Sequence, residues 1–238
     1  MKYRVLVFFI VCLCLSSTVK AQEEDVDFQT WVDFTGYRFV SDKSAVGGDA
    51  GIRGLFSSRV WTQFYIRPTY RYQFNSLDLS GGFALFYTYN SDISNVTEWR
   101  LFQQATVHWP STNILKFNHR IRLEQRWFNY SDERDNEFYA RIRYQLTMRS
   151  RDFSIYNQKL YFKVSAEAFQ RNNSGDEAFV NTSRFTFVVG HRPKGRFWYE
   201  VQYIAQKSRQ FEEDGFKTSE HILRFRLFRA DIFKHRID

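Results

Sequence analysis

The chain contains little cysteine, proline and glycine for its length. Its 238 residues include two cysteines, three prolines and 11 glycines. Both cysteines, Cys12 and Cys14, lie in the first 21 residues, so a chain processed after Ala21 has no disulfide and no thiolate metal site. So few prolines and glycines are untypical of a disordered chain. Beyond residue 21 there is also no apolar run of the ~20 residues that a membrane-spanning helix needs.

The first 21 residues have the parts of a secretory signal peptide. Lys2 and Arg4 provide a charged start, an apolar run continues to Leu15, and Ala21 ends a segment suited to cleavage. The run is too short for a membrane anchor. We therefore expect residues 1–21 to be a cleaved signal peptide and residues 22–238 to form one domain. The signal carries three cations and no acid, so its removal lowers the net charge from +8 to +5.

A period-two alternation of polar and apolar residues runs through most of the remaining chain. It is clearest between Leu115 and Trp127, where the residues between the polar ones are mostly apolar. Successive side chains of a β-strand point to opposite faces, so this stretch predicts a strand with one apolar and one charged face. The polar positions are Lys116, Asn118, Arg120, Arg122, Glu124 and Arg126.

Alternation and turn-forming residues divide the chain into eleven predicted strands, with no helical segment of useful length. Each is near the ~9–11 residues of a tilted membrane-crossing strand. Because single-chain bacterial barrels have even strand numbers, eleven indicates one error, which we place before Val60, and we expect 10–12 strands. The segments are Val26–Phe39, Asp49–Phe56, Val60–Tyr72, Leu79–Tyr89, Glu98–Trp109, Leu115–Trp127, Phe138–Met148, Leu160–Phe169, Phe179–Arg192, Phe197–Ala205 and Thr218–Phe228.

These features predict an all-β fold, a transmembrane antiparallel β-barrel with an apolar outside and a polar, Arg-rich lumen. The mean hydropathy of −0.50 is compatible with such a barrel, because only alternate residues meet lipid. Aromatic residues make up 19% of the chain. Several lie on apolar faces near strand ends, as in interfacial girdles. The alternatives are a soluble sandwich or a soluble barrel with an apolar interior, since periodicity alone does not say which face is inside.

The lengths of the connections predict an orientation. Residues 110–112 and 193–195 are tight turns, whereas residues 90–97, 129–135, 171–176 and 207–215 are longer and polar. Short periplasmic turns alternate with longer outer loops in such barrels. From Leu79 onward this alternation holds and leaves the C-terminus in the periplasm; before Leu79 we do not find it. Pro68 predicts a bulge or a sheet edge.

Three charged motifs carry a resemblance to a known family. They are Glu98-Trp99-Arg100 followed by Gln103-Gln104, then Arg120-Ile121-Arg122-Leu123-Glu124-Gln125-Arg126-Trp127, then Arg141-Ile142-Arg143-Tyr144 one strand later. Their order and spacing resemble the Gram-negative outer-membrane proteins of domain of unknown function 2490, over roughly Phe28 to Phe228. The resemblance implies an outer-membrane barrel and no firm activity. Many such barrels end on an aromatic residue, whereas this chain continues to Asp238.

The charged faces supply the candidate site. Arginines on Leu115–Trp127 are expected to face those on Phe138–Met148, and like charges opposite each other repel. In one interpretation an Arg–Glu network braces a narrow lumen; in the other, a cationic lining binds or passes anions. The candidate lumen-lining or anion-binding residues are Arg100, Arg120, Arg122, Glu124, Arg126, Arg141, Arg143, Arg224 and Arg226.

Catalytic, metal and nucleic-acid sites are not evident. His108 is predicted to point inward and His119 and His221 outward, and none has a Ser or Asp at a spacing that indicates a catalytic pair. The acidic clusters lie at the N-terminus or in loops, so we expect no metal and no cofactor. Export and the scattered basic residues argue against nucleic acid.

We therefore expect a non-enzymatic, porin-like barrel of the Gram-negative outer membrane, with a lumen that is largely occluded or narrow and favours anions. The alternative is an outer-membrane enzyme acting on lipid or surface substrates. The expected partners are outer-membrane lipid, periplasmic chaperones and the barrel-insertion machinery, and a small anionic solute.

Overall fold

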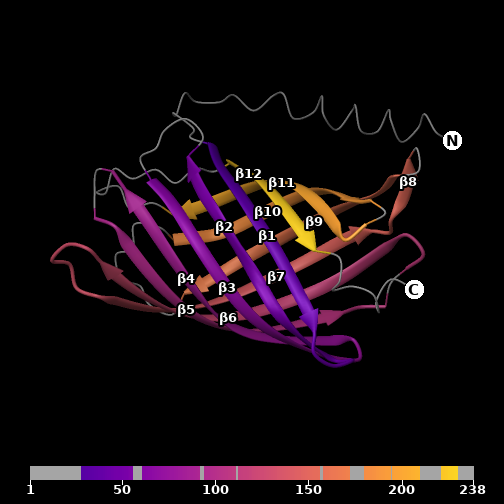
Figure 1. Cartoon of the computed structure of the whole chain (residues 1–238), viewed down its shortest axis with the longest axis horizontal. Coiled ribbons are helices and arrows are strands. Elements are labelled where there is room, and N and C mark those ends of the chain that lie inside the picture. The colour runs from indigo at the N-terminus through magenta and orange to yellow at the C-terminus, as the bar shows by residue number, and fades with distance from the viewer. Residues whose placement is uncertain are drawn as a thin grey trace.

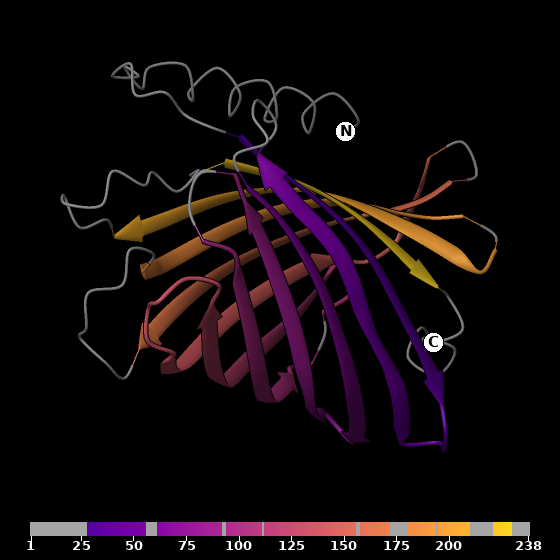
Figure 2. The same cartoon turned by 60° about the vertical axis from the view of Figure 1, so that its left-hand side comes forward.

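The protein forms a barrel of long tilted strands (Figure 1), whose curved wall is seen from a second side in Figure 2. The computed structural model describes residues 28–55, 61–91, 94–110, 112–155, 158–171, 180–193, 195–209 and 221–229. The predicted signal peptide, the last residues to Asp238, and the acidic clusters at 23–25 and 212–214 lie outside these ranges. Among the described residues there is no helix long and apolar enough to cross a membrane.

Eleven long strands and one short one make up the described residues, and each of the eleven predicted segments corresponds to one long strand. The strands are β1 (Phe28–Phe39), β2 (Ser44–Leu55), β3 (Trp61–Phe74), β4 (Leu77–Asn90), β5 (Val96–His108), β6 (Leu115–Tyr130), β7 (Glu137–Ser150), β8 (Phe153–Ile155), β9 (Gln158–Arg171), β10 (Val180–Arg192), β11 (Phe197–Arg209) and β12 (His221–Arg229).

The barrel closes through a parallel pairing of its first and last strands. β1 pairs with β12 from Phe28↔His221 to Thr35↔Phe228, whereas the other neighbours pair antiparallel. β8 pairs only with β9 and extends beyond the closed ring. When eleven strands alternate in direction, the first and the last run the same way, so these two strands must pair in parallel to close the barrel. The expectation of an even number, and of an error before Val60, is therefore wrong, because it assumed an all-antiparallel ring.

Charged residues face the interior and apolar residues face outward, as the alternation predicted. Ile121 and Ile142 are 56% and 49% exposed, whereas Glu124, one position beyond the Leu123–Ile142 pair of β6 and β7, is 0% exposed. An interior-apolar soluble barrel or sandwich would have the opposite arrangement. The interior also holds two small apolar clusters, Trp31 with Ile204 and Ile222, and Tyr65 with Ala84 and Phe86.

β2 begins earlier than the sequence indicated, because two glycines lie inside the strand. A Cβ atom on Gly47 or Gly48 would lie 2.2 Å from the backbone oxygen of Gly36 or Arg67, respectively. Gly48 pairs with Pro68 and has a φ of 153°, a conformation that glycine adopts at little cost. Pairing of β3 with β4 stops at Ile66 and resumes in the same register at Thr69, so Pro68 produces neither a bulge nor an edge.

Short connections gather at one end of the barrel, which we call the turn end; the opposite end, where β1 starts, is the loop end. At the turn end two residues join β3 to β4, and four join β1 to β2 and β10 to β11. Asn75, with a φ of 47°, makes the two-residue turn possible. At the loop end eight residues separate β9 from β10 and eleven separate β11 from β12. The alternation of connection length therefore holds at the start of the barrel, where the sequence did not reveal it. The tight turn expected at residues 110–112 is instead part of a six-residue connection between β5 and β6, longer than the five residues between β4 and β5.

Candidate functional site

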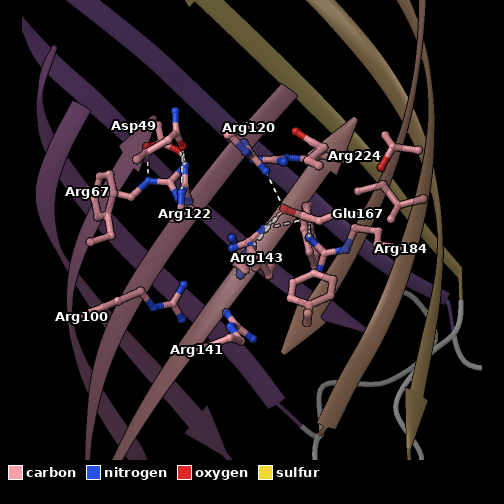
Figure 3. Close-up of a pocket in the computed structure, with 18 of the residues that line it drawn as sticks. Asp49, Arg67, Arg100, Arg120, Arg122, Arg141, Arg143, Glu167, Arg184 and Arg224 are labelled. Atoms are coloured by element: carbon pink, nitrogen blue, oxygen red, sulfur yellow. Dashed lines mark hydrogen bonds and ion pairs between the residues drawn. The ribbon is translucent and has the colours of Figure 1, made fainter. Parts of the chain in front are cut away.

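The predicted lumen residues converge on one large cavity. The interior encloses about 1080 Å³, and all eight candidate arginines line it. Its lining runs from Tyr130 and Glu137 near the loop end to Arg71 and His108 near the turn end. Figure 3 shows guanidinium groups from several strands directed into this space. The alternation thus places the candidate arginines on the interior surface.

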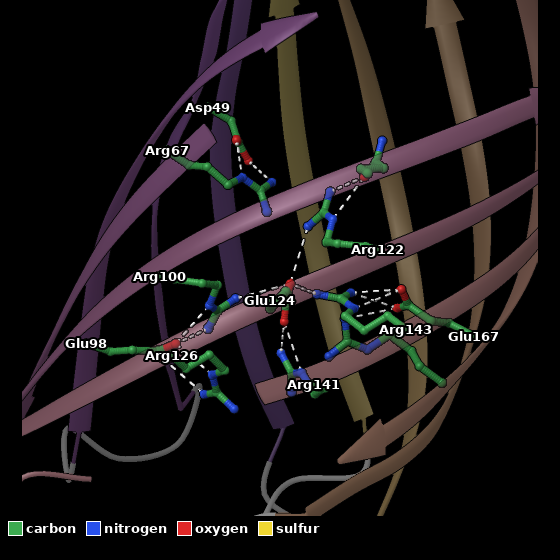
Figure 4. A network of polar contacts seen from close by, with 12 residues as sticks. Asp49, Arg67, Glu98, Arg100, Arg122, Glu124, Arg126, Arg141, Arg143 and Glu167 are labelled. Carbon is green, nitrogen blue, oxygen red and sulfur yellow. Dashed lines mark hydrogen bonds and ion pairs between the residues drawn. The ribbon is translucent and has the colours of Figure 1, made fainter. Parts of the chain in front are cut away.

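Glu124 lies at the centre of the charged ladder and is the one candidate beneath the cavity lining rather than on it. Its carboxylate accepts hydrogen bonds from Arg141 at 2.6 Å and Arg143 at 2.9 Å. Arg100 and Arg122 lie 3.7 and 3.6 Å from the same carboxylate (Figure 4). Four cations therefore surround one fully buried acid, which offsets the repulsion between arginines that the strand register brings together.

Two further glutamates extend this network along the barrel wall. Glu98 on β5 binds Arg100 at 2.6 Å and Arg126 at 2.7 Å. Glu167 on β9 binds Arg120 at 2.6 Å and Arg143 at 2.9 Å. The arginine–glutamate network, made of these three glutamates and their arginine partners, thus runs from β5 to β9. Because no contact of this network reaches farther than the next-neighbouring strand, the network braces the wall without crossing the cavity (Figure 4).

A second polar cluster, of which the sequence analysis singled out only Arg224, braces β1 to β3 and β12. The Tyr65 hydroxyl donates to Asp33 and lies 3.2 Å from Asp49. Arg67 forms two bonds with Asp49, of 2.7 and 2.6 Å, and Arg224 donates to Asp33. These residues lie on the inward face of their strands, but their partners lie on other strands whose register the sequence does not give.

Cations outnumber acids in the interior. Fourteen lysines and arginines and five acids line the cavity, and three buried acids, Asp33, Glu124 and Glu200, complete the interior set. Within this set of lining and buried residues, six cations are therefore in excess. Four arginines donate at short distance to neutral oxygens: Arg53 to Gln63 (3.2 Å), Arg122 to Gln104 (2.6 Å), Arg184 to Gln206 (2.5 Å) and Arg226 to Thr35 (2.9 Å).

Aromatic rings among the arginines are a feature that the sequence analysis missed. The Arg53 guanidinium lies 4.2 Å from the ring centre of Trp31, and that of Arg100 lies 4.3 Å from Phe86. Arg143 lies 4.9 Å from the ring centre of Phe169. Rings at such distances attract cations and hold long side chains against the wall. These aromatics occupy inward positions of their strands. The period-two alternation would have located them if the inward face had not been assumed to be polar throughout.

The histidines divide between the two faces as predicted. His108 points inward at the turn end, where its Nε2 lies 2.8 Å from Asp78, and Arg71 lies 3.6 Å from the same carboxylate. His119 and His221 lie on the outer face, where Nδ1 of each is 2.6 Å from a tyrosine hydroxyl. The His108–Asp78 contact, on neighbouring strands β5 and β4, is one that sequence spacing did not indicate.

The loops described by the structure provide no metal site. No group of three or more His, Cys, Asp or Glu side chains suited to a metal ion occurs among the described residues. In the predicted acidic loop, Asp132 instead pairs with Arg134 at 2.9 Å. The interior thus offers charge, hydrogen-bond donors and space, rather than a metal centre, as its chemistry.

Comparison with known proteins gives one match. The model of a family described as "Protein of unknown function (DUF2490)" matches residues 28–217. This range begins with the first residue of β1 and covers the strands as far as β11. No curated protein and no solved structure matches the chain.

Proposed function

Because the chain belongs to the family of proteins of unknown function DUF2490, whose description assigns no activity, we propose a function from the geometry of the interior. We propose that the protein is a non-enzymatic outer-membrane barrel with a narrow lumen that admits small anions in preference to cations. The observation that carries the proposal is the excess of six cations around a cavity that extends from one end of the barrel towards the other.

The apolar outer face supports insertion into a lipid bilayer. Large apolar side chains are exposed along β3 to β7, including Phe64, Ile66, Leu101 and Ile121. A soluble monomer rarely exposes a contiguous apolar surface of this extent, because contact with water is unfavourable. Near the strand ends, exposed aromatics such as Tyr72, Trp109 and Trp127 suit the headgroup region. With the short turns on the periplasmic side, the C-terminus faces the periplasm.

The interior supports a narrow rather than an open passage. Barrels of eight strands are filled by side chains, and those of 16–18 strands enclose wide channels, so eleven strands lie between these limits. A volume of about 1080 Å³ holds water and small solutes, yet long arginine side chains occupy the lining on every side (Figure 3). Small anions would therefore pass close to guanidinium groups.

Planar-bilayer recording of the refolded mature chain tests the proposal. Across a KCl gradient we expect small conductance steps and a reversal potential displaced towards the equilibrium potential of chloride. Arg122→Gln removes a lumen cation whose short hydrogen bonds go to neutral Gln104, so this variant should fold and shift the reversal potential towards zero. The absence of steps from correctly inserted protein, or cation-selective steps, would overturn the proposal.

Lys43→Gln is a matched control for charge. Lys43 is exposed in the connection between β1 and β2 and does not line the cavity. Lys43 lies at the turn end, so the Lys43→Gln substitution changes the net charge of the protein without changing the lumen. We expect its reversal potential to match that of the unmodified protein.

The His108–Asp78 contact favours one second candidate, an outer-membrane hydrolase acting on lipid or surface substrates. A histidine held by a carboxylate is suited to general-base chemistry. Arg71, however, approaches the same carboxylate, which also suits a purely structural contact. The test is hydrolysis of fluorescent phospholipid and peptide substrates by the refolded barrel. Hydrolysis by the unmodified protein that is lost in His108→Ala supports an enzyme. Equal hydrolysis by the two proteins excludes a catalytic role for this pair.

A further inference from the structure

A second cavity lies at the turn end, beside the mouth of the lumen. It encloses about 230 Å³. Its walls come from the starts of β6 and β9, the ends of β7 and β10, and the short strand β8 with the connection before it. We call it the turn-end cradle, and its lining residues are Lys116, Arg149, Arg151, Asp152, Ser154, Lys159 and Arg192.

The cradle concentrates positive charge, with five cations and one acid. The register places cations directly opposite each other: Lys116 faces Arg149 across β6 and β7, and Lys159 faces Arg192 across β9 and β10. Like charges at directly paired positions destabilise a sheet. These residues continue the inward phase of their strands, so their charges face the cavity side rather than the apolar outer surface.

Asp152 compensates only part of this charge. It accepts from Arg149 at 2.5 Å and from Arg192 at 3.0 Å, which fixes these two guanidinium groups in one arrangement. The Arg149 guanidinium also lies 4.0 Å from the ring centre of Tyr161. Both arginines are therefore held in place before any ligand arrives, a condition that lowers the entropy cost of binding.

The remaining cations have no acidic partner in the part of the chain that the structure describes. Arg151 donates to the backbone oxygen of Thr112 at 3.2 Å. Neither Lys116 nor Lys159 lies within ion-pair distance of a described acid. Ser154 adds a hydroxyl to the same lining. Positioned arginines with free ammonium groups and a hydroxyl are the donors that phosphate oxygens accept most strongly.

We propose that the turn-end cradle is a binding site for a phosphate group, distinct from the lumen. Arg149 and Arg192 provide fixed guanidinium donors, and Lys116 and Lys159 supply the uncompensated charge that a phosphate neutralises. The phosphate belongs either to a phospholipid headgroup at the membrane surface or to a small soluble phosphate compound. Both have the same recognition chemistry.

Two binding measurements on the full mature barrel distinguish these sources. The first is titration calorimetry with inorganic phosphate in a zwitterionic detergent at low ionic strength, where screening is weak. The second is native mass spectrometry in micelles that contain phosphatidylglycerol, with phosphatidylcholine, whose phosphate is balanced by its own quaternary ammonium group, as the reference without net charge. In at least one of them we expect saturable binding, which Lys116→Gln with Lys159→Gln weakens by about tenfold, as for the loss of a charge-assisted hydrogen bond.

Control variants separate the cradle from the lumen and from folding. Lys43→Gln removes a charge elsewhere at the turn end and should bind phosphate as the unmodified protein does. Arg122→Gln removes a lumen cation, reports any phosphate held in the lumen, and should weaken binding less than the cradle variants do. Folding of each variant is checked by the change in its gel migration on heating. Where the double variant Lys116→Gln with Lys159→Gln does not fold, the single variant Lys159→Gln is measured in its place. Binding in neither measurement, binding unchanged by the cradle variants, or binding lost equally in Arg122→Gln would overturn the proposal.

Discussion

Arg143 donates to the carboxylate of Glu124 at 2.9 Å, in a pair whose acid is completely buried in the barrel wall. The same guanidinium also holds Glu167 at 2.9 Å, so one arginine ties β7 to both of its neighbouring strands. Burial of an ion pair costs solvation of both charges, and this cost is offset only when each charge keeps its partners. The stability of this wall therefore depends on the acids, which are fewer than the cations.

Replacement of Glu124 should destabilise the barrel strongly. Glu124→Ala leaves Arg141 and Arg143 without this carboxylate, and we expect a loss of about 3 kcal/mol or more in the free energy of unfolding. Gln125→Ala, on the outer face of the same strand, is the control and should change it by less than about 1 kcal/mol. Urea titration of the barrel in lipid vesicles, followed by tryptophan fluorescence, measures both. Equal effects would contradict the inward role of Glu124.

Selectivity should depend on the arginines that bind neutral oxygens. Arg184 donates to Gln206 and lies 3.8 Å from Glu167, and Arg226 donates to Thr35. Glutamine at either position therefore removes positive charge at the loss of at most one long ion pair. We expect each variant to reduce the preference for chloride over potassium, and the double variant to reduce it further. Reversal potentials in a KCl gradient give the ratio. A double variant with the ratio of the unmodified protein would show that these side chains do not line the route of the ions.

Gly190 should tolerate no side chain, because Tyr161 lies across it. A Cβ atom there would fall 2.1 Å from the tyrosine ring, whereas at Gly195 nothing lies within 4 Å. We expect Gly190→Ala to destabilise the barrel by about 1–3 kcal/mol through overpacking. Gly195→Ala should be close to neutral. Unfolding in urea measures both variants, and an equally mild effect at the two sites would mean that Tyr161 does not occupy this position.

A designed disulfide tests the parallel closure. Val32 on β1 is paired with Phe225 on β12, and both face outward. Cysteines at these positions lie at the separation of adjacent strands, which a disulfide spans. We expect the pair to oxidise and to change migration on non-reducing gels. The control pair at Val32 and Phe64 has Ile52 of β2 between its members and should stay reduced. The opposite result would exclude the observed closure.

Much of the fold followed from the alternation of residues, because each side chain of a barrel strand meets one of two very different environments. The segment Leu115–Trp127 shows this best: its charged positions face inward and Ile121 faces outward. The number of strands also followed from this pattern. The rule that the number should be even did not apply, because it describes all-antiparallel rings and not one closed by β1 and β12.

The site could be predicted only in part. The alternation of polar and apolar residues located Arg100, Arg122 and Glu124 on the interior face. The partners of each residue depend on strand register, which period-two patterns do not fix. The contact between His108 and Asp78 was hidden for the same reason. The start of β2 was missed because Gly47 and Gly48 are typical of a turn, whereas here they permit close approach to β1 and β3.

The parallel contact of β1 with β12 also decides where the two ends of the chain emerge. In a barrel with an even number of strands, the chain enters and leaves on the same side. Here it enters the wall at the loop end and leaves it at the turn end, and the twelve residues of β1 alone span about 40 Å. In the membrane arrangement proposed above, a tag inserted directly before Phe28 and one inserted directly after Arg229 would therefore lie on opposite sides of the bilayer. A linker that joins Phe28 to Arg229 in a circular permutant would have to span the length of the barrel wall.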